Sequence, residues 1–335
     1  MRYELVPLVL AMLLVGCAAE PRQPDWIAGN SAKYPQAQFL IGRGQADAPA
    51  QARDRARADL AKAFQVAVEE VSEDVTTYTA TGAAASNSSS IQAQVSRTVR
   101  ATTAQVVEGV VIAEQWQAET GADHHALAVL ERQPAMIRLR AEIRGLDDAT
   151  DAAIAAARTS SDVIVQAGSA QRAVDAQFDR LAEQRVLRIV DASGMGEPQR
   201  HNLAKLIGDR DALLARIKLT SAVDSDTLGG LDELLPAAVA AAGFTPATPE
   251  QATHNLSAVF DHTEFRDAQG WYWLRGALTI RLVSADGTAR GNHRWPIKVS
   301  ARDAGTVGQR ARAAVQDTLN RDLRNVVIGF GQKDQ

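Results

Sequence analysis

The stretch Trp271–Ser300, WYWLRGALTIRLVSADGTARGNHRWPIKVS, predicts a β-hairpin. The dipeptide Asp286-Gly287 near its middle is typical of a type I′ turn between two strands. Pairing outward from this dipeptide places Leu278 opposite Trp295. Because side chains alternate between the two faces of a strand, one face of the hairpin is apolar and can pack on a core. The hairpin therefore favours an antiparallel sheet with helices on its apolar face.

The opposite face of the hairpin carries two tryptophans and four cationic side chains. Aromatic rings offer rigid contact area, and arginine binds carboxylates and phosphates through two parallel hydrogen bonds. Partner proteins and polymers present both kinds of group. Two alternatives stay open: another element covers the tryptophans, or they lie singly on a solvated face. The candidate partner-binding face consists of Trp271, Trp273, Arg275, Arg281, Arg294 and Lys298.

Segments on either side of the hairpin can cover its apolar face. After it, Asp303 precedes a helix with apolar residues at four-residue spacing. Before it, Asp226 can cap a helix that ends at Gly243-Phe244, a pair typical of the Schellman motif. The alternation in 256–260 predicts a further strand. We therefore expect residues 213–335 to form an α+β domain with helices on an antiparallel sheet.

An alanine-rich helical region precedes this domain. It runs from Pro134 to about Asp191 with a pause near Gly168, and it predicts two long helices in an antiparallel hairpin. Apolar heptads are not sustained along it, so a coiled coil with a partner is only weakly indicated. We expect residues 151–212 to form a helical spacer between two domains.

A second region of strand and helix signals lies nearer the N-terminus. Residues 38–44 predict a strand that ends in a Gly-x-Gly turn, and a helix with alanines at every fourth position follows. Small side chains allow a helix to lie close to a sheet. Residues 65–71 predict a second strand, and β-rich runs follow at 106–116 and 126–131. We expect residues 34–150 to form a small helix-on-sheet domain.

The N-terminus carries a lipoprotein-type export signal. A short basic start and an apolar run lead to Leu14-Val15-Gly16-Cys17, which predicts a signal peptide of residues 1–16 and a lipid on Cys17. Cys17 is the only cysteine, so the chain contains no disulfide. Residues 17–33 are expected to be a tether, and Ala18 supplies no aspartate that would indicate the inner membrane. The alternative is an ordinary secretory signal with an accidental cysteine.

Several sequence features together resemble one family of bacterial envelope proteins. PDWI, a following YP, FLIGRGQA, and a helix of spaced alanines leading into FQVAVEEVSED resemble the Lpp-twenty lipoprotein family. The resemblance covers roughly residues 24–150 and implies a small α+β domain behind a lipidated cysteine at the outer membrane. In that family, some members are tied to flagellar assembly. The matching positions are Pro24, Trp26, Tyr34, Pro35, Gly42, Gly44, Ala52, Ala56, Ala58, Leu60 and the strand expected from Val66.

The sequence contains no motif for catalysis, a cofactor or a metal. HExxH, Walker, CxxC and Gly-x-Ser-x-Gly patterns are absent, and His124 and His125 would point to opposite faces of a strand. With 36 Lys and Arg against 40 Asp and Glu, the net charge of −4 argues against nucleic acid as a partner. We therefore expect no catalytic residue, no metal and no cofactor.

Two function classes follow from these features. The favoured one is a lipid-anchored, non-catalytic protein at the periplasmic face of the outer membrane, where the lipid on Cys17 contacts the membrane. It would bind other envelope proteins or cell-wall polymer, in a structural or assembly role. The alternative is a periplasmic hydrolase of cell-wall or lipid substrates, which a deep pocket with converging polar side chains would favour.

Overall fold

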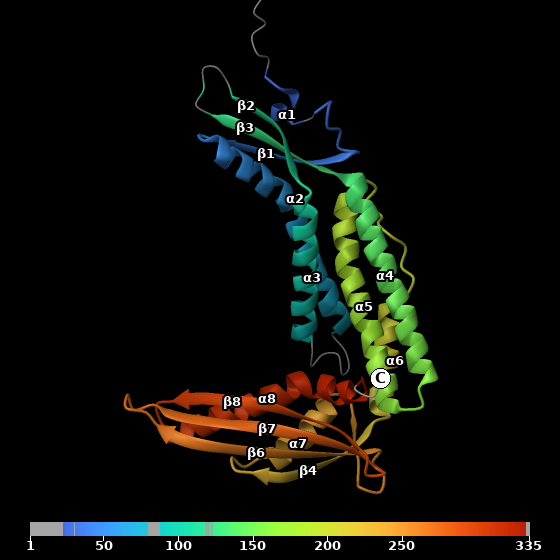
Figure 1. The fold of residues 1–335 in the computed structure, drawn as a ribbon, viewed down its shortest axis with the longest axis vertical. Helices are drawn as coiled ribbons and strands as arrows, with labels where there is room; N and C mark the ends of the chain where they lie inside the picture. The colour runs from blue at the N-terminus through green and yellow to red at the C-terminus, as the bar shows by residue number, and fades with distance from the viewer. Residues whose placement is uncertain (1–22, 30, 80–87, 118–120, 122, 333–335) are drawn as a thin grey trace, which may run out of the picture.

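The computed structural model describes residues 23–29, 31–79, 88–117, 121 and 123–332. Within these residues, two β-sheets lie at opposite ends of a curved molecule, and long helices connect them (Figure 1). The architecture is α+β, as the sequence predicted. The expected signal peptide and the expected lipidation site, Cys17, lie outside the described residues.

The elements alternate between short strands and long helices. The N-terminal part contains α1 (Asp25–Ala28), β1 (Phe39–Ala46), α2 (Pro49–Thr79), α3 (Ser88–Glu108), β2 (Val111–Gln117) and β3 (His124–Glu131). The middle contains α4 (Arg132–Thr159), α5 (Val163–Val190) and α6 (Leu203–Ala215). The C-terminal part contains β4 (Lys218–Asp226), α7 (Leu231–Ala241), β5 (Thr245–Pro246), β6 (His254–Arg266), β7 (Tyr272–Ser284), β8 (Ala289–Ala301), α8 (Ala304–Gly329) and the 3₁₀ turn η2 (Phe330–Gln332).

The N-terminal sheet has the order β1-β3-β2, and both strand pairs are antiparallel. α2 contacts β1 through its buried alanines Ala52 and Ala56, as their spacing predicted. The predicted Gly-x-Gly turn is wrong, because Gly42 and Gly44 lie inside β1. A Cβ atom on either glycine would collide with backbone atoms of α2. The two glycines therefore allow α2 to approach the strand closely.

The second face of this sheet is covered by α1. Trp26 is buried against Leu127 and Val129 of β3, and its indole Nε1 donates to Glu114 Oε2 at 2.7 Å. Part of the expected tether is therefore folded, because burying the large indole side chain stabilises this contact.

The predicted strand at residues 65–71 is also wrong, because these residues continue α2. Val66, Val68 and Val71 favour strands locally. However, α2 lies beside α3 and α5, and this helix packing decides the conformation (Figure 1). The strand that pairs with β1 is instead β3, far along the chain.

The predicted pair of long helices is confirmed: α4 and α5 run side by side in opposite directions (Figure 1). The predicted break near Gly168 is wrong, because the helices are separated at residues 160–162 and Gly168 is buried inside α5. Their apolar side chains do not form a separate core. Leu139 and Ile143 of α4 and Phe178 of α5 share one cluster with Leu60 of α2 and Val99 of α3. The helices expected to be a spacer therefore extend the core of the N-terminal sheet.

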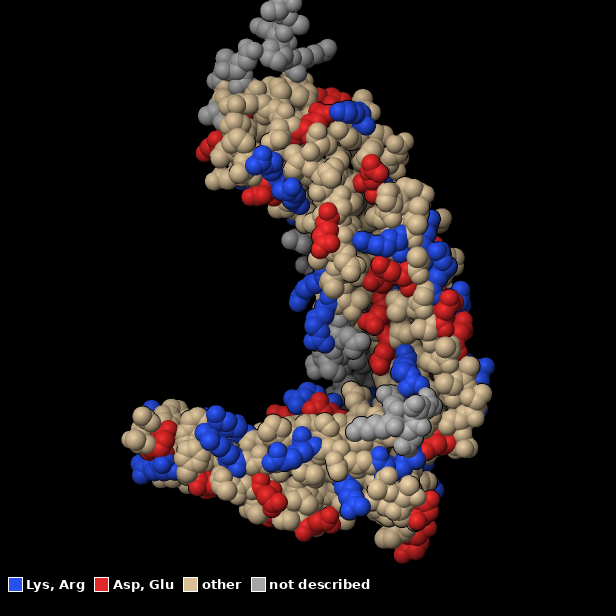
Figure 2. Space-filling model, viewed as in Figure 1, with Lys and Arg blue, Asp and Glu red and all other residues tan. Residues whose placement is uncertain are grey.

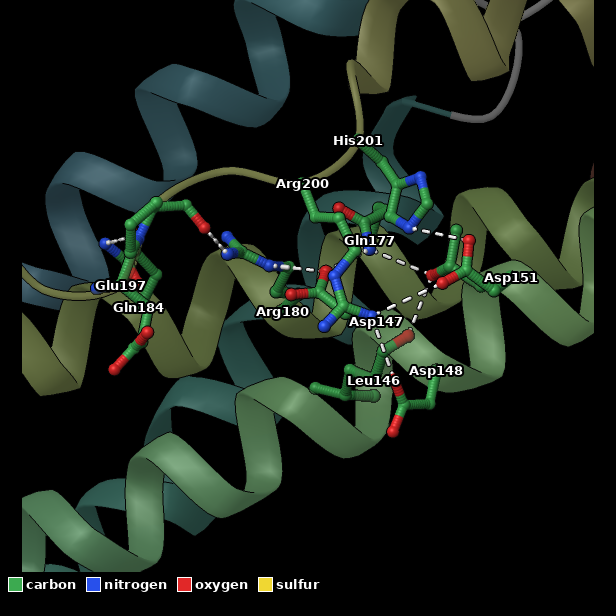
Figure 3. A network of polar contacts seen from close by, with 12 residues as sticks. Leu146, Asp147, Asp148, Asp151, Gln177, Arg180, Gln184, Glu197, Arg200 and His201 are labelled. Atoms are coloured by element: carbon green, nitrogen blue, oxygen red, sulfur yellow. Dashed lines mark hydrogen bonds and ion pairs between the residues drawn. The ribbon is translucent and has the colours of Figure 1, made fainter.

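A buried ion pair links α4 to α5 (Figure 3). Arg180 Nε donates to Asp147 Oδ1 at 2.8 Å, and both side chains are at most 6% exposed. Gln177 Nε2 donates to Asp147 Oδ1 and to Thr150 Oγ1 at 3.1 and 2.9 Å. Arg180 also donates to the carbonyl of Pro198, so the loop after α5 is held by the same group. The network therefore fixes the position of α4 along α5.

Glu183 of α5 is a second buried polar group between helices. Thr102 Oγ1 of α3 donates to its Oε1 at 2.6 Å, while Oε2 has no hydrogen-bond partner among the described residues. Burial, together with the neighbouring Glu142, raises the pKa of Glu183 from 4.5 to about 7. The folded chain therefore binds a proton at Glu183 more tightly than the unfolded chain does.

We expect a Glu183→Gln variant to be more stable than the wild type at about pH 8, by ~2 kcal/mol. The raised pKa means that the wild type loses stability as the pH rises from about 4.5 to about 7. Glutamine has no proton to lose, so the two proteins should be equally stable near pH 4. Denaturant unfolding at several pH values measures this difference. The exposed Asp54→Asn should keep the wild-type pH profile, and a pH-independent gain in Glu183→Gln would contradict the explanation.

The C-terminal sheet has the order β5-β4-β6-β7-β8. The pairs β6–β7 and β7–β8 are antiparallel, as predicted, but β4 pairs in parallel with β5 and β6. α7 follows β4 and returns the chain to the end of the sheet where β4 began, so β5 and β6 run in the same direction as β4. The predicted Schellman stop is confirmed, since Phe244 N–H donates to the carbonyl of Val239 and Gly243 has a φ of 88°.

The register predicted for β7 and β8 is confirmed, whereas the predicted turn type is wrong. Leu278 lies opposite Trp295. Only Gly287 has a positive φ in the connection, and a type I′ turn needs two such residues. The loop therefore contains one more residue than a type I′ turn allows, and a bulge at the start of β8 restores the predicted register.

α7 and α8 cover the apolar face of the C-terminal sheet (Figure 1). Leu278, Ile280 and Trp295 pack there with Leu319 and Leu323 of α8, as the four-residue spacing predicted. The start of α5 enters the same cluster through Ile164, and Arg290 of β8 binds Asp162 at 2.6 Å. The opposite face of the sheet is left without a covering helix among the described elements.

Candidate functional site

The uncovered face of the C-terminal sheet brings the six candidate residues together. Arg275 lies opposite Lys298, Thr279 opposite Arg294, and Trp273 opposite Ser300. Arg281 lies six residues after Arg275 on β7, and even spacing keeps both on one face. Trp271 directly precedes β7 at an even spacing from Trp273 and Arg275, so it shares their face. The four cationic side chains are exposed, and both tryptophans are half-buried.

Cationic side chains lie over aromatic rings at the end of this face near the β6–β7 turn, which is its projecting end. Lys298 lies over the ring of Trp273, with Nζ 5.1 Å from the ring centroid. Arg275 lies over Phe265 at 4.9 Å, and Arg302 over Trp271 at 4.2 Å. Each of these distances is within the range of a cation–π contact. The cations thus stay near the rings, where their charge remains accessible to solvent.

Sequence reasoning missed two members of this cluster, Phe265 and Arg302. Phe265 of β6 is 41% exposed and stacks on Trp273, with ring planes 7° apart and centroids 6.3 Å apart. Only the pairing of β6 with β7 places these rings side by side. Arg302 continues the even spacing of Lys298 and Ser300 and therefore lies on the same face. Extending the predicted strand by two residues would have included it.

Asp267 holds the tryptophans in position at the β6–β7 turn. Its Oδ2 accepts from Trp273 Nε1 at 2.8 Å, and its Oδ1 accepts from the backbone N–H of Trp271 at 2.8 Å. The hydrogen bond from Trp273 holds the pKa of Asp267 below its ordinary value, so the carboxylate stays charged. The indole edge is thereby oriented before any partner binds.

The face is cationic although the whole chain has a net charge of −4. Across the described residues, no carboxylate lies within ion-pair distance of Arg275, Arg281, Arg294 or Lys298. Asp261 is exposed on β6 and is hydrogen-bonded to Ser225. Figure 2 shows Lys and Arg side chains on the projecting end of this domain. We name Trp271, Trp273, Arg275, Arg281, Arg294, Lys298, Phe265 and Arg302 the cationic aromatic face.

The described residues offer no metal centre of three or more His, Cys, Asp or Glu side chains. His124 and His125 are neighbours in β3, and His125 packs beside Trp116 at a ring separation of 5.4 Å. Within the same residues, each helix is too short or too polar to cross a bilayer.

The fold and this face define the class of the protein: an elongated α+β protein with a cationic aromatic surface at one end. Residues 24–131 match the model of the LPP20 lipoprotein family, which confirms the resemblance over the N-terminal sheet, α2 and α3. The match is under half of the chain, and the cationic aromatic face lies beyond it.

Two solved structures are similar to parts of the chain. The secreted protein HP1454 from Helicobacter pylori is 12% identical with a TM-score of 0.42, covering 85% of this chain and 98% of that one. A minor lipoprotein from Acinetobacter baumannii is 15% identical with a TM-score of 0.26, covering 36% of this chain and 97% of that one. No curated protein matches the chain.

Proposed function

We propose that this protein is a lipid-anchored, non-catalytic envelope protein that binds an anionic envelope component on its cationic aromatic face. The anchor is the lipid on Cys17, at the periplasmic face of the outer membrane. The match of residues 24–131 to a lipoprotein family supports the anchor. The observation that carries the binding role is that four exposed cations have no carboxylate within ion-pair distance among the described residues: Arg275, Arg281, Arg294 and Lys298.

The shape of the molecule supports this division of roles. The N-terminal sheet and the cationic aromatic face lie at opposite ends of the curved molecule (Figure 1). α5 alone has 28 residues and therefore spans about 42 Å between them. An anchor at the N-terminal end would hold the face away from the membrane surface, where it can reach a partner.

The chemistry of the face selects carboxylate or phosphate groups. Arg275, Arg281 and Arg294 each present a planar guanidinium that can donate two hydrogen bonds to such a group. Trp271 and Trp273 add rigid apolar contact area. An acidic protein or an anionic cell-wall polymer carries the complementary groups.

A charge reversal tests the binding role. We expect Arg275→Glu/Lys298→Glu to bind polyglutamate about tenfold more weakly than the wild type at low salt. The matched control is Arg97→Glu/Arg144→Glu, which makes the same charge change on exposed positions of α3 and α4. Equal losses in both variants would show that net charge, and not this face, decides binding. Crosslinking in cells from position 275 then identifies the physiological partner.

Cell fractionation tests the anchor separately. We expect the wild type in the membrane fraction and Cys17→Ala in the soluble fraction, because loss of the acyl chains removes the membrane affinity. The charge-reversed variant should remain with the membrane. Mass spectrometry that finds an unmodified Cys17 thiol in the native protein would refute the anchor without affecting the binding role.

A further inference from the structure

A groove far from the cationic aromatic face lies where α4, α5 and α6 meet. α4 and α6 each pack against α5, and between them is a cavity of about 540 Å³. Its floor is Ala170 and Ala173 of α5, which are 8% and 1% exposed. These small side chains, together with Ala157 of α4, leave the space that larger residues would fill.

The walls of this groove carry half-buried apolar side chains among polar ones. α4 contributes Ile154, and α6 contributes Leu206 and Leu213. A volume of this size lies within the range of small-molecule sites, which are typically apolar with a few polar groups. The groove therefore suits a narrow apolar ligand.

One end of the groove is cationic and the other is neutralised. Arg158 in the last turn of α4 and Arg216 at the end of α6 line the same end, where Arg216 donates to Gln166 of α5 at 3.2 Å. Over the described part of the chain, neither arginine has a carboxylate within ion-pair distance. At the other end, Arg200 pairs with Asp148 and Asp151 at 2.8 and 3.3 Å (Figure 3).

The remaining cation along the wall is also neutralised. Lys205 binds Asp209 at 2.6 Å on α6 itself. The uncompensated positive charge of the groove is therefore concentrated at Arg158 and Arg216, next to the apolar side chains. A groove with apolar side chains and one cationic end is complementary to an amphiphile that carries one anionic head.

We infer that the groove binds a single-chain anionic amphiphile, with its alkyl chain on Ala170 and Ala173 and its carboxylate or phosphate at Arg158 and Arg216. Charge complementarity places the head at this end, because the opposite end is occupied by its own ion pairs. This site is independent of the cationic aromatic face.

Isothermal titration calorimetry on the full chain tests the inference with three probes below their micelle concentrations. Dodecanoate and dodecyl phosphate carry the two possible heads, and dodecyl maltoside carries a neutral one. We expect the wild type to bind one or both anionic probes at least about tenfold more tightly than the neutral probe. The anionic probe that binds more tightly identifies the preferred head group, carboxylate or phosphate.

Variants locate the binding. Arg158→Glu/Arg216→Glu should weaken the anionic probes about tenfold and leave the neutral probe unchanged. Ala157→Phe, at a half-exposed position, should weaken all three by filling the groove. Arg97→Glu/Arg144→Glu matches the charge change and should bind as the wild type does. Absence of anionic binding to the wild type, or equal losses in both charge-reversed proteins, would overturn the inference. Arg158 and Arg216 are exposed, so their replacement tests it without disturbing the core.

Discussion

A Gly44→Ala variant is expected to lose about 3 kcal/mol of free energy of unfolding. The added Cβ atom would lie inside van der Waals distance of the carbonyl of Ala52 and the backbone nitrogen of Ala56. Both are backbone atoms of α2, so no side chain can rotate away. The helix would have to separate from β1 along the whole contact. Denaturant unfolding, followed by circular dichroism, measures the loss.

Gly208→Ala provides the matched control for this prediction. Gly208 lies inside α6, and no neighbouring atom lies within 4 Å of its Cβ position. The same chemical change there should stabilise the protein by about 0.5–1 kcal/mol, because alanine favours the helix. A Gly44→Ala variant that unfolds within about 1 kcal/mol of the wild type would show that α2 does not contact β1 in this way.

Removing the partner of Arg180 is expected to have a comparable effect. Asp147→Ala should cost about 3–5 kcal/mol of the free energy of unfolding, because a buried guanidinium loses its counter-charge. Asp147 and Arg180 are 6% and 5% exposed, so water does not replace the lost contact. Gln177 loses a hydrogen-bond acceptor as well. The same unfolding experiment measures the cost.

Two further variants separate burial from simple loss of a salt bridge. Asp147→Leu/Arg180→Met removes both charges and should recover at least half of the loss, since apolar pairs of similar volume often replace buried ion pairs. Arg200→Ala breaks the exposed ion pairs with Asp148 and Asp151 in the same network (Figure 3), and should cost less than about 1 kcal/mol. A double variant as unstable as Asp147→Ala would argue against an uncompensated charge as the cause.

The proposed function and the inferred groove divide the molecule into separate surfaces. The cationic aromatic face lies on β6, β7 and β8, while the groove lies on α4, α5 and α6. Charge reversal at Arg275 and Lys298 should therefore leave amphiphile binding unchanged. Either proposal can fail without the other.

Patterns within one segment were sufficient to predict several elements. The alternation in 271–300 predicts the register of β7 against β8, and the pair Gly243-Phe244 predicts the end of α7. The spacing of Ala52 and Ala56 predicts a helix that lies close to a sheet. These features are local, because backbone geometry alone sets which side chains share a face.

Contacts between distant segments decided the rest. Residues 65–71 favour a strand by themselves, but the packing of α2 beside α3 and α5 keeps them helical. Phe265 reaches Trp273 only because β6 pairs with β7, and the groove exists only because α4 and α6 meet α5 from different sides. The sequence by itself thus determined which residues alternate, cap or repeat. Tertiary structure determined which of them meet, because the free energy of burying and pairing distant side chains exceeds local preference.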